Sequence, residues 1–481
     1  MWQQRGRMES AGKKITVVGL ARSGAGAARL LAEMGAVVTV TDSKPARDLT
    51  DIISTLPASV RLCLGSHPHE IFSDTDLIVV SPGVPLAIKP LADAKAAGKR
   101  IIGELELAYQ IIKSRIAEEK AIPFLAITGS NGKSTTTTLL NHMMKAAGFR
   151  TMFGGNIGNA LTEEILKINR SNAVPEVVVA EISSFQLEAI ETFRPQIAAI
   201  LNITPDHLDR YHSMQEYAAA KAAIFQNQHL PDILILNADD PETMKLYEAG
   251  LSERVRGPHV YFFSRMHDVE GLFVKDGVVA VNLLHHEQGA VNLELINVRD
   301  IRIKGVHNLE NAMAASAMAL LAGCPVEAVR VSLREFPGLE HRLELVRELD
   351  GVKYINDSKG TNVGAVIKSI ESIDVPIILI AGGRDKAGDF AALRSAAAGR
   401  VKKAVLIGEA AGKIEHVLAD VMGTVLAKDL REAVEIARAS AKEGDAVLLS
   451  PACASFDMFR DFEDRGNQFK TIVRELEAVH A

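Results

Sequence analysis

The chain has few cysteines and few aromatic residues. It carries three cysteines, one tryptophan and 5% aromatic residues in 481 positions. Cys63, Cys324 and Cys453 are an odd number without a C-x-x-C spacing, so the sequence indicates neither a disulfide framework nor a zinc site. This cysteine usage favours the reducing cytosol as the compartment, and we expect a cytoplasmic protein.

Long apolar runs and an excess of positive charge are also missing. No stretch reaches the roughly 18 apolar residues that a membrane-spanning helix needs, and the basic N-terminus lacks the apolar segment of a signal peptide. The net charge of −6 argues against a surface for nucleic acid, which is usually basic. We therefore expect no membrane insertion and no nucleic-acid partner, and we expect residues 1–12 to be mobile.

The composition that is present is typical of an α/β enzyme. Hydrophobic residues make up 47% of the chain, and the length suggests roughly three domains. Short apolar strands alternate with helical segments in three series, which predicts mostly parallel sheets with ligands at the C-terminal ends of the strands. The expected strands are 14–20, 37–41, 77–80, 124–128, 177–180, 197–203, 233–236, 352–355, 377–381, 404–407 and 446–449. The segment 252–304 alternates differently and predicts a β-rich edge of the central domain.

One of these strands leads directly into a phosphate-binding turn. The apolar segment 124–128 is followed by Gly129, Ser130, Asn131, Gly132, Lys133, Ser134 and Thr135. Backbone N–H groups of such a turn point at a polyphosphate, Lys133 adds a positive charge, and the Ser134 hydroxyl can bind Mg²⁺. The spacing departs from the usual P-loop, since Ile127 stands where that pattern has its first glycine. The segment predicts ATP binding; a turn without a ligand is the alternative.

A second nucleotide site is indicated near the N-terminus. The turn 19–24 follows the first strand, and Ala21 stands where a dinucleotide fingerprint has its middle glycine. NAD is therefore disfavoured. We expect another diphosphate to bind this turn, with Ala21, Arg22 and Ser23 and the turn Ser81, Pro82 and Gly83 around it, and with Asp42 and Ser43 at its base or ribose. A purely structural turn remains the alternative.

Two further polar groups follow predicted strands of the central series. Glu181 comes directly after the strand 177–180, where a carboxylate suits Mg²⁺, although a helix-capping role is the alternative. His207 follows the strand 197–203. A single histidine is more often structural, but beside Glu181 and Ser134 it favours a second metal site.

The signals further along the chain are weaker. Asn308 and Asn311 lie one turn apart on a predicted helix and could contact an adenine. Arg342 can neutralise phosphate oxygens with its planar fork. Asp357 and Lys359 lie in a polar cluster after the strand 352–355, where surface turn residues are the alternative.

A set of these segments, in this order, resembles the Mur ligase family. They are GSNGKST at 129–135, GNIG at 155–158, EISSFQL at 181–187, DHLDRY at 206–211 and HNLENA at 307–312. Three later segments resemble the members of that family that add D-glutamate, namely DSKGTN at 357–362, SPACASFD at 450–457 and FEDRGN at 462–467. The similarity covers about residues 13–475, and Ser130 and Ala21 depart from the family pattern.

The resemblance implies an architecture and a reaction. It implies a Rossmann-like UDP-substrate domain at 1–105, a central P-loop ATPase domain at 106–338 and a Rossmann-like amino-acid domain at 339–481. In the implied reaction ATP phosphorylates the carboxylate of UDP-N-acetylmuramoyl-L-alanine, and the amine of D-glutamate attacks the acyl phosphate. We expect a monomer whose partners are these small molecules.

The resemblance also implies roles for single residues. Ser134 and Glu181 would hold one of two Mg²⁺ ions, and His207 would help to hold the other. Lys221 falls where the family carries a carbamylated lysine, a role that the residue alone would not suggest. Catalysis would rest on Lys133, His207, Lys221 and Arg342. ATP would bind to the turn 129–135 and to Asn308, Asn311, Arg342 and Asp357. Asn156 would contact the muramoyl substrate, and D-glutamate would bind to Lys359, Thr361, Lys386, Ser455, Phe456 and Phe462.

Other functions fit the sequence less well. A sister ligase or a folylpolyglutamate-synthase-like enzyme would share the ATPase core but not the N-terminal nucleotide unit and the segment 357–362. A nucleotide-dependent switch would not need Glu181, His207 and the C-terminal polar clusters. A dehydrogenase is disfavoured by Ala21.

Overall fold

The computed structural model describes residues 10–116, 121–171, 173–207, 210–251, 257–285, 289–385 and 388–478. The chain forms two compact units, one of Met1–Ile301 with His307–Glu335 and the other of Arg302–Val306 with Phe336–Ala481. Residues 1–9, which are most of the segment expected to be mobile, and Lys386 lie outside the described residues.

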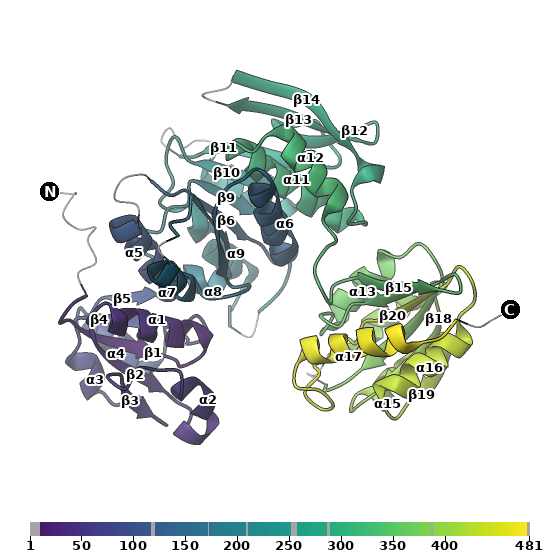
Figure 1. The fold of residues 1–481 in the computed structure, drawn as a ribbon, viewed down its shortest axis with the longest axis horizontal. Helices are drawn as coiled ribbons and strands as arrows, with labels where there is room; N and C mark the ends of the chain where they lie inside the picture. The colour runs from purple at the N-terminus through teal and green to yellow at the C-terminus, as the bar shows by residue number, and fades with distance from the viewer. Residues whose placement is uncertain are drawn as a thin grey trace. The chain divides into compact units, whose positions relative to one another are not determined.

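The N-terminal part of the first unit is a parallel five-stranded sheet with the strand order β3-β2-β1-β4-β5 (Figure 1). The connections reverse direction between β1 and β4, which is the switch point where open α/β sheets bind ligands. The strands are β1 (Lys14–Val18), β2 (Val37–Asp42), β3 (Arg61–Leu64), β4 (Leu77–Val80) and β5 (Ile101–Gly103). The helices are α1 (Arg22–Glu33), η1 (Ala46–Asp48), α2 (Thr50–Ile53), α3 (Glu70–Ser73), α4 (Lys89–Ala96), α5 (Glu104–Ile111) and η2 (Ile112–Ile116).

The rest of the first unit is built on a nine-stranded sheet with the order β14-β13-β12-β11-β10-β9-β6-β8-β7. It is parallel from β7 to β12, and β13 and β14 continue it as antiparallel strands, which confirms the predicted β-rich edge. Because β6 lies between β8 and β9, the turns that follow these three strands meet at one edge of the sheet.

The strands of this sheet are β6 (Phe124–Thr128), β7 (Thr151–Gly155), β8 (Val177–Glu181), β9 (Ile197–Ile200), β10 (Ile233–Asn237), β11 (His259–Ser264), β12 (Gly271–Lys275), β13 (Val278–His285) and β14 (Gly289–Asn297). The helical segments are α6 (Lys133–Ala146), α7 (Leu161–Ser171), α8 (Ser184–Leu187), α9 (Met214–Ala222), η3 (Ala223–Phe225), α10 (Pro241–Leu246), η4 (Tyr247–Leu251), η5 (Val298–Asp300), α11 (Val306–Leu321) and α12 (Val326–Glu335).

The second unit has a six-stranded sheet with the order β15-β16-β20-β17-β18-β19, in which only β15 is antiparallel. One apolar cluster covers each face of this sheet, as a mainly parallel sheet requires. The strands are β15 (Glu344–Leu349), β16 (Val352–Asn356), β17 (Ile377–Gly382), β18 (Val401–Ile407), β19 (Gly423–Leu426) and β20 (Ala446–Leu449). The helices are α13 (Val363–Glu371), η6 (Phe390–Ala392), α14 (Leu393–Ala397), α15 (Ala411–Leu418), α16 (Leu430–Ser440) and α17 (Phe462–Glu475).

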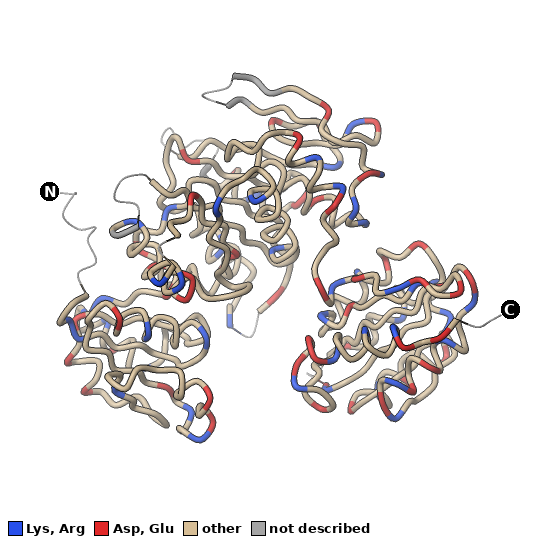
Figure 2. The backbone as a smooth tube through the Cα atoms, viewed as in Figure 1, with Lys and Arg blue, Asp and Glu red and all other residues tan. Residues whose placement is uncertain are grey.

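In the first unit one apolar cluster runs from the five-stranded sheet into the nine-stranded sheet, and a second cluster packs on the five-stranded sheet around Val18, Ile78 and Val80. Helix α1 packs against α7, and a Cβ on Gly26 would lie 2.7 Å from Thr162 Oγ1, so this approach needs a glycine. Basic and acidic residues are interspersed along both units (Figure 2). Within the described ranges, none of the helices is long and apolar enough to cross a membrane. The predicted α/β class with mostly parallel sheets is confirmed.

Candidate functional site

The phosphate-binding turn connects β6 to α6 as predicted. Gly132 has a φ of 83° at the N-cap of α6, and a Cβ there would lie 2.1 Å from Asn311 Oδ1. Glycine is therefore required by both its backbone angle and its neighbour. The Thr136 hydroxyl donates to Asn311 Oδ1 at 3.2 Å, and Asn311 Nδ2 donates to Asn308 Oδ1 at 3.3 Å. The structure thus brings both predicted asparagines of α11 to the start of α6.

Two lysines meet at this turn. Lys133 Nζ donates to Gly129 O at 2.8 Å and to Ser130 O at 3.0 Å, and Lys221 Nζ donates to Gly129 O at 2.9 Å. Lys221 is only 1% exposed and lies over the ring of Tyr217. Burial, and after it the charge of Lys133, lowers the pKa of Lys221 to about 7. Sequence spacing gave no sign of this pairing, because 92 residues separate Lys221 from Gly129.

The turn is held from the β9 side. The Ser130 hydroxyl donates to Thr204 O at 3.0 Å and lies 3.1 Å from the Tyr217 hydroxyl. Asn131 N donates to Asn202 Oδ1 at 2.8 Å. The turn thus keeps its shape through contacts with the segment after β9, which accepts hydrogen bonds from the N–H groups of Ser130 and Asn131.

Glu181 lies at the end of β8 with its carboxylate buried. It is 2% exposed, and Oε1 accepts a hydrogen bond from Asn156 Nδ2 at 2.6 Å. Oε2 is buried without a hydrogen-bond partner, which is an expensive arrangement unless a cation completes it. Ser134, on the neighbouring element α6, is also buried. This donor set fits Mg²⁺, which takes one or two carboxylates and otherwise phosphate and water oxygens.

His207 lies on the turn after β9, with a φ of 53°. Its ring is half exposed, 3.6 Å from Asp206 Oδ2, and its centroid lies 4.8 Å from that of Phe185. Among the described residues, no group of three or more His, Cys, Asp or Glu side chains is placed to hold a metal ion. The second metal site around His207 and Lys221 therefore stays a prediction.

The predicted diphosphate turn lies at the N-terminus of α1. Ala21 is the N-cap without a side-chain cap, and the first turn of the helix carries no acidic residue, an arrangement that favours an anion there. Ser81 Oγ donates to Gly19 O at 2.7 Å, which ties the β4 turn containing Pro82 and Gly83 to this loop. Arg22 Nη2 donates to Asn156 O at 3.2 Å.

Asp42 supports the same loop from the end of β2. Its two carboxylate oxygens accept hydrogen bonds from Leu20 N at 2.6 Å and from Lys44 N at 2.8 Å. The side chain thus fixes the turn before α1. Its contact with a base or ribose, and that of Ser43, stay predictions.

In the second unit Asp357 is buried at the end of β16. Oδ2 accepts hydrogen bonds from Ser450 Oγ at 2.6 Å and from Ser369 Oγ at 2.7 Å. Burial raises the pKa of Asp357, while these hydroxyl bonds and the charge of Arg342 oppose the rise. Arg342 and Asp357, both predicted to contact ATP, are therefore electrostatic neighbours.

Two of the residues predicted to bind the amino acid, Lys359 and Phe462, lie close together at the start of α17. Lys359 Nζ lies 5.2 Å from the ring centroid of Phe462, and Thr361 N donates to Lys359 O at 2.8 Å. Ser455 is buried, whereas Phe456 is 62% exposed. A pocket made of these residues stays a prediction.

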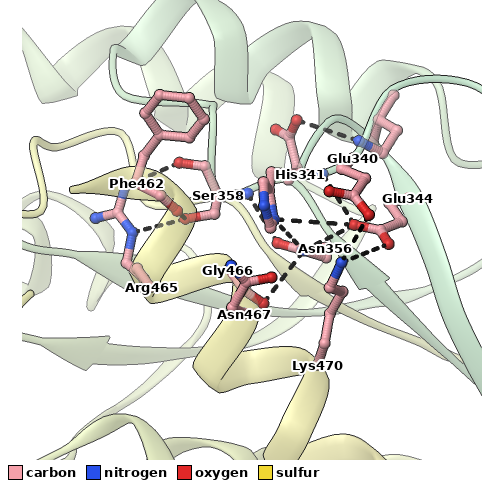
Figure 3. A network of polar contacts seen from close by, with 12 residues as sticks. Glu340, His341, Glu344, Asn356, Ser358, Phe462, Arg465, Gly466, Asn467 and Lys470 are labelled. Atoms are coloured by element: carbon pink, nitrogen blue, oxygen red, sulfur yellow. Dashed lines mark hydrogen bonds and ion pairs between the residues drawn. The ribbon is translucent and has the colours of Figure 1, made fainter.

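Arg465 links these segments and was not foreseen. It is fully buried, and its N–H groups donate to Ser358 Oγ and O at 2.9 Å and to Cys453 O at 3.3 Å (Figure 3). Burial lowers the pKa of Arg465 to about 10. The available signal was its place on the buried stripe of α17, four residues before Phe469, where a charge is unexpected.

Family models match three parts of the chain. "Mur ligase MurD-like, N-terminal domain" matches residues 13–103, "Mur ligase middle domain" matches 127–319, and "Mur ligase, glutamate ligase domain" matches 341–453. With the curated relatives that follow, these matches show that the chain belongs to the Mur ligase family.

Curated relatives match over nearly the full length. A UDP-N-acetylmuramoylalanine--D-glutamate ligase of Geotalea daltonii is 48% identical over 98% of this chain and 99% of its own. The protein of that name from Citrifermentans bemidjiense is 46% identical over 97% and 98%, and the one from Pelotomaculum thermopropionicum is 44% identical over 96% and 98%.

Solved structures share the fold. MurF from Acinetobacter baumannii matches with a TM-score of 0.58 at 17% identity, over 91% of this chain and 90% of its own. A pseudomurein peptide ligase type C from Methanothermus fervidus matches with a TM-score of 0.54 at 18% identity, over 97% and 100%. At these identities the likeness supports the architecture alone.

Proposed function

We propose that this protein is an ATP-dependent ligase that joins D-glutamate to UDP-N-acetylmuramoyl-L-alanine in peptidoglycan precursor synthesis. The observation that carries the proposal is the phosphate turn with two lysines at Gly129 and the buried, partly unpartnered carboxylate of Glu181 beside it. The curated relatives support the choice of substrates. We also propose that the chain has three functional domains, at residues 1–105, 106–338 and 339–481.

The first chemical task is to bring a carboxylate to the γ-phosphate of ATP, although both are negative. Lys133 can leave its contacts with the turn's carbonyl oxygens and bind the transferred phosphate. The N–H groups at the start of α6 hold the other phosphates. Arg342, beside Asp357 in the second unit, would offset further charge.

Mg²⁺ would be held by Glu181 and Ser134, and it would neutralise charge on the phosphate oxygens. Asn156 fixes one oxygen of Glu181 at 2.6 Å and leaves the other for the ion. A second ion near His207 and Lys221 is part of this proposal.

We also propose that Lys221 is carbamylated. Only a neutral amine reacts with carbon dioxide, and burial holds the pKa of Lys221 at about 7, so much of it is neutral in the cell. The product is an anion, which would replace the repulsion between Lys221 and Lys133 by attraction. Intact-mass measurement of protein kept in bicarbonate at alkaline pH should show about 44 Da more than after acid treatment. The Lys221→Arg variant is the control and should show no such difference. If the wild type shows no difference either, the modification is contradicted.

In the second step the amine of D-glutamate attacks the acyl phosphate, and inorganic phosphate leaves. The residues proposed to bind D-glutamate are Lys359, Thr361, Lys386, Ser455, Phe456 and Phe462. The buried charge of Arg465 beneath the 453–455 segment favours an anion here.

The test is product formation. Purified protein with ATP, Mg²⁺, UDP-N-acetylmuramoyl-L-alanine and D-glutamate should yield ADP, phosphate and a product whose mass equals the two substrates minus water. Turnover of ATP that yields no such product would contradict the proposal.

A further inference from the structure

A buried histidine in the second unit has no part in the reaction proposed above. His341 is 3% exposed and lies between β16 and α17 (Figure 3). Asn356 Nδ2 lies 2.9 Å from His341 Nδ1. Since an amide nitrogen can only donate, Nδ1 is the acceptor, and the ring is neutral with its proton on Nε2. Burial and the charge of Lys470 lower the pKa of His341, in agreement with a neutral ring.

Helix α17 lies directly against this ring. A Cβ at Gly466 would lie 2.1 Å from His341 Nδ1 and 2.8 Å from Cε1, so no larger residue fits while the ring stays in place. Gly466 is in the first half of the helix, where glycine is less favourable than alanine. The helix thus keeps an unfavourable residue at a position that faces the ring, and Phe462 at the start of the same helix lies edge-on to the ring, with 6.2 Å between the centroids.

The backbone of His341 connects two segments that the proposed reaction uses. Its φ of 61° is in the left-handed region, which is uncommon for a residue other than glycine. Its carbonyl oxygen accepts a hydrogen bond from Lys359 N at 3.0 Å, and the next residue is Arg342. A movement of His341 would therefore shift Arg342 and Lys359 together.

Charged groups fix the same turn from the other side. His341 N donates to Glu344 Oε2 at 2.9 Å, and Asn356 Nδ2 donates to the same oxygen at 3.0 Å. Lys470 Nζ, also on α17, lies 3.2 Å from Glu344 Oε1 and 3.4 Å from Glu340 Oε1. The turn is thus tied to α17 at Gly466 and again one turn later at Lys470.

We propose that Gly466 and His341 are positioning residues for the amino-acid and phosphate groups. Because residue 466 is a glycine, α17 can pack against the His341 ring. The packed ring holds the left-handed turn in its conformation, and this turn determines the positions of both Arg342 and Lys359. This inference rests on the proposed function, because Arg342 and Lys359 have their roles from it.

The test compares two glycines on helices. Gly466→Ala forces the ring away, and a displacement of about 1 Å at reacting groups costs on the order of 100-fold in rate. We expect kcat/KM to fall by about tenfold or more, with higher KM values for ATP and D-glutamate. The KM for the UDP-substrate should stay within about twofold, since its groups are in the other unit. Gly412→Ala on α15 is the control, because nothing lies within 4 Å of a Cβ there.

A double variant tests the contact itself. His341→Asn removes the ring and tolerates the left-handed backbone. In Gly466→Ala with His341→Asn the methyl group enters the space that the ring has left, so the defect should be no larger than in His341→Asn alone. Defects that multiply would overturn the proposal, because they would mean that the two residues act independently.

The remaining outcomes separate this inference from the proposed function. If the wild-type protein makes no product, the proposed function fails. If the wild-type protein is active and Gly466→Ala has unchanged KM values, or has all three raised alike, only the positioning role fails. Should Gly466→Ala not fold, the same split of KM values in His341→Asn supports the proposal, and equal changes in all three contradict it.

Discussion

Two ammonium groups at one carbonyl oxygen determine the charge balance of the phosphate turn. Lys133 and Lys221 both donate to Gly129 O, at 2.8 and 2.9 Å. Burial, and after it the nearby charge of Lys133, makes the charged form of Lys221 costly, and the pKa of Lys221 falls to about 7. The two ammonium groups therefore favour an anion, such as a phosphate of ATP, in this turn.

Removal of the first of these charges tests the phosphate role. Lys133→Ala should abolish ligation, a loss of about 10³-fold or more, because Lys133 meets the charge of the transferred phosphate. Lys145→Ala, an exposed lysine on the same helix, should keep wild-type rates. Substantial product formation by Lys133→Ala, measured by mass, would remove Lys133 from the mechanism.

Removal of the second charge should stabilise the fold. In the unmodified protein Lys221 has a pKa of about 7 when folded and an ordinary value near 10.5 when unfolded. The folded state thus binds fewer protons between these values, and stability falls as the pH is lowered from about 10.5 to 7. Lys221→Met should therefore unfold at higher denaturant than the wild type, with a gain that grows toward pH 7, and it should be inactive. A gain that is the same at pH 7 and pH 10 would contradict this account.

The hydrogen bond between Asn156 and Glu181 predicts an effect of Asn156 on the affinity for Mg²⁺. Asn156→Ala leaves the Glu181 side chain free to rotate. About tenfold more Mg²⁺ should then be needed for half-maximal rate, because loss of a residue that hydrogen-bonds a metal ligand typically weakens metal binding by this amount. Mn²⁺ titration followed by electron paramagnetic resonance, in the presence of a non-hydrolysable ATP analogue, should show the same weakening. Asn159→Ala is the control on the same loop. An unchanged metal affinity with a raised KM for the UDP-substrate would assign Asn156 to the substrate alone.

At the scale of elements, buried strands could be predicted and exposed edge strands could not. The strands at Leu77–Val80 and Ala446–Leu449 were predicted at these residues, because continuous apolar runs are typical of parallel strands buried on both faces. Strands β3 and β19 have the same length and were missed, since none of their residues is buried. These two segments form strands because they hydrogen-bond to a neighbouring strand, and their own pattern of apolar residues does not indicate it.

Some residues of the candidate site could also be predicted from the sequence and others could not. The turn 129–135 and Glu181 were predicted because each directly follows an expected strand, and Asn311 was predicted, on a weaker signal, from its place on a helix. The contacts of Lys221 with Gly129 O and of Arg465 with Ser358 were not, because 92 and 107 residues separate the partners. A buried charge can be recognised only when the fold shows what surrounds it.

The start of α17 gives a prediction at this scale. Asp461 caps the helix by accepting a hydrogen bond from Asp464 N at 2.7 Å. Asp461→Ala should lower the free energy of unfolding of the second unit by about 1 kcal/mol, whereas Asp461→Ser should lose much less, since serine also caps. Denaturant unfolding measures both. Equal losses would mean that the cap contributes nothing and that another property of Asp461 is involved.

At the scale of the whole molecule, the residues predicted to bind ATP and D-glutamate are distributed over two units. The first unit holds the phosphate turn, Glu181 and the α1 turn, and one apolar cluster extends through both of its sheets. The second unit holds Arg342, Lys359 and the segments tied by Arg465 on a core of its own. Under the proposed function, the residues predicted for D-glutamate are thus in the second unit, and those predicted for ATP are divided between the two units.

Phosphate release from ATP, measured with different amino acids, tests the central claim most directly. The protein is given UDP-N-acetylmuramoyl-L-alanine and Mg²⁺ with D-glutamate, L-glutamate, L-lysine, meso-diaminopimelate or no amino acid. The account predicts sustained release with D-glutamate only. Sustained release with another amino acid, or with none, would contradict the account.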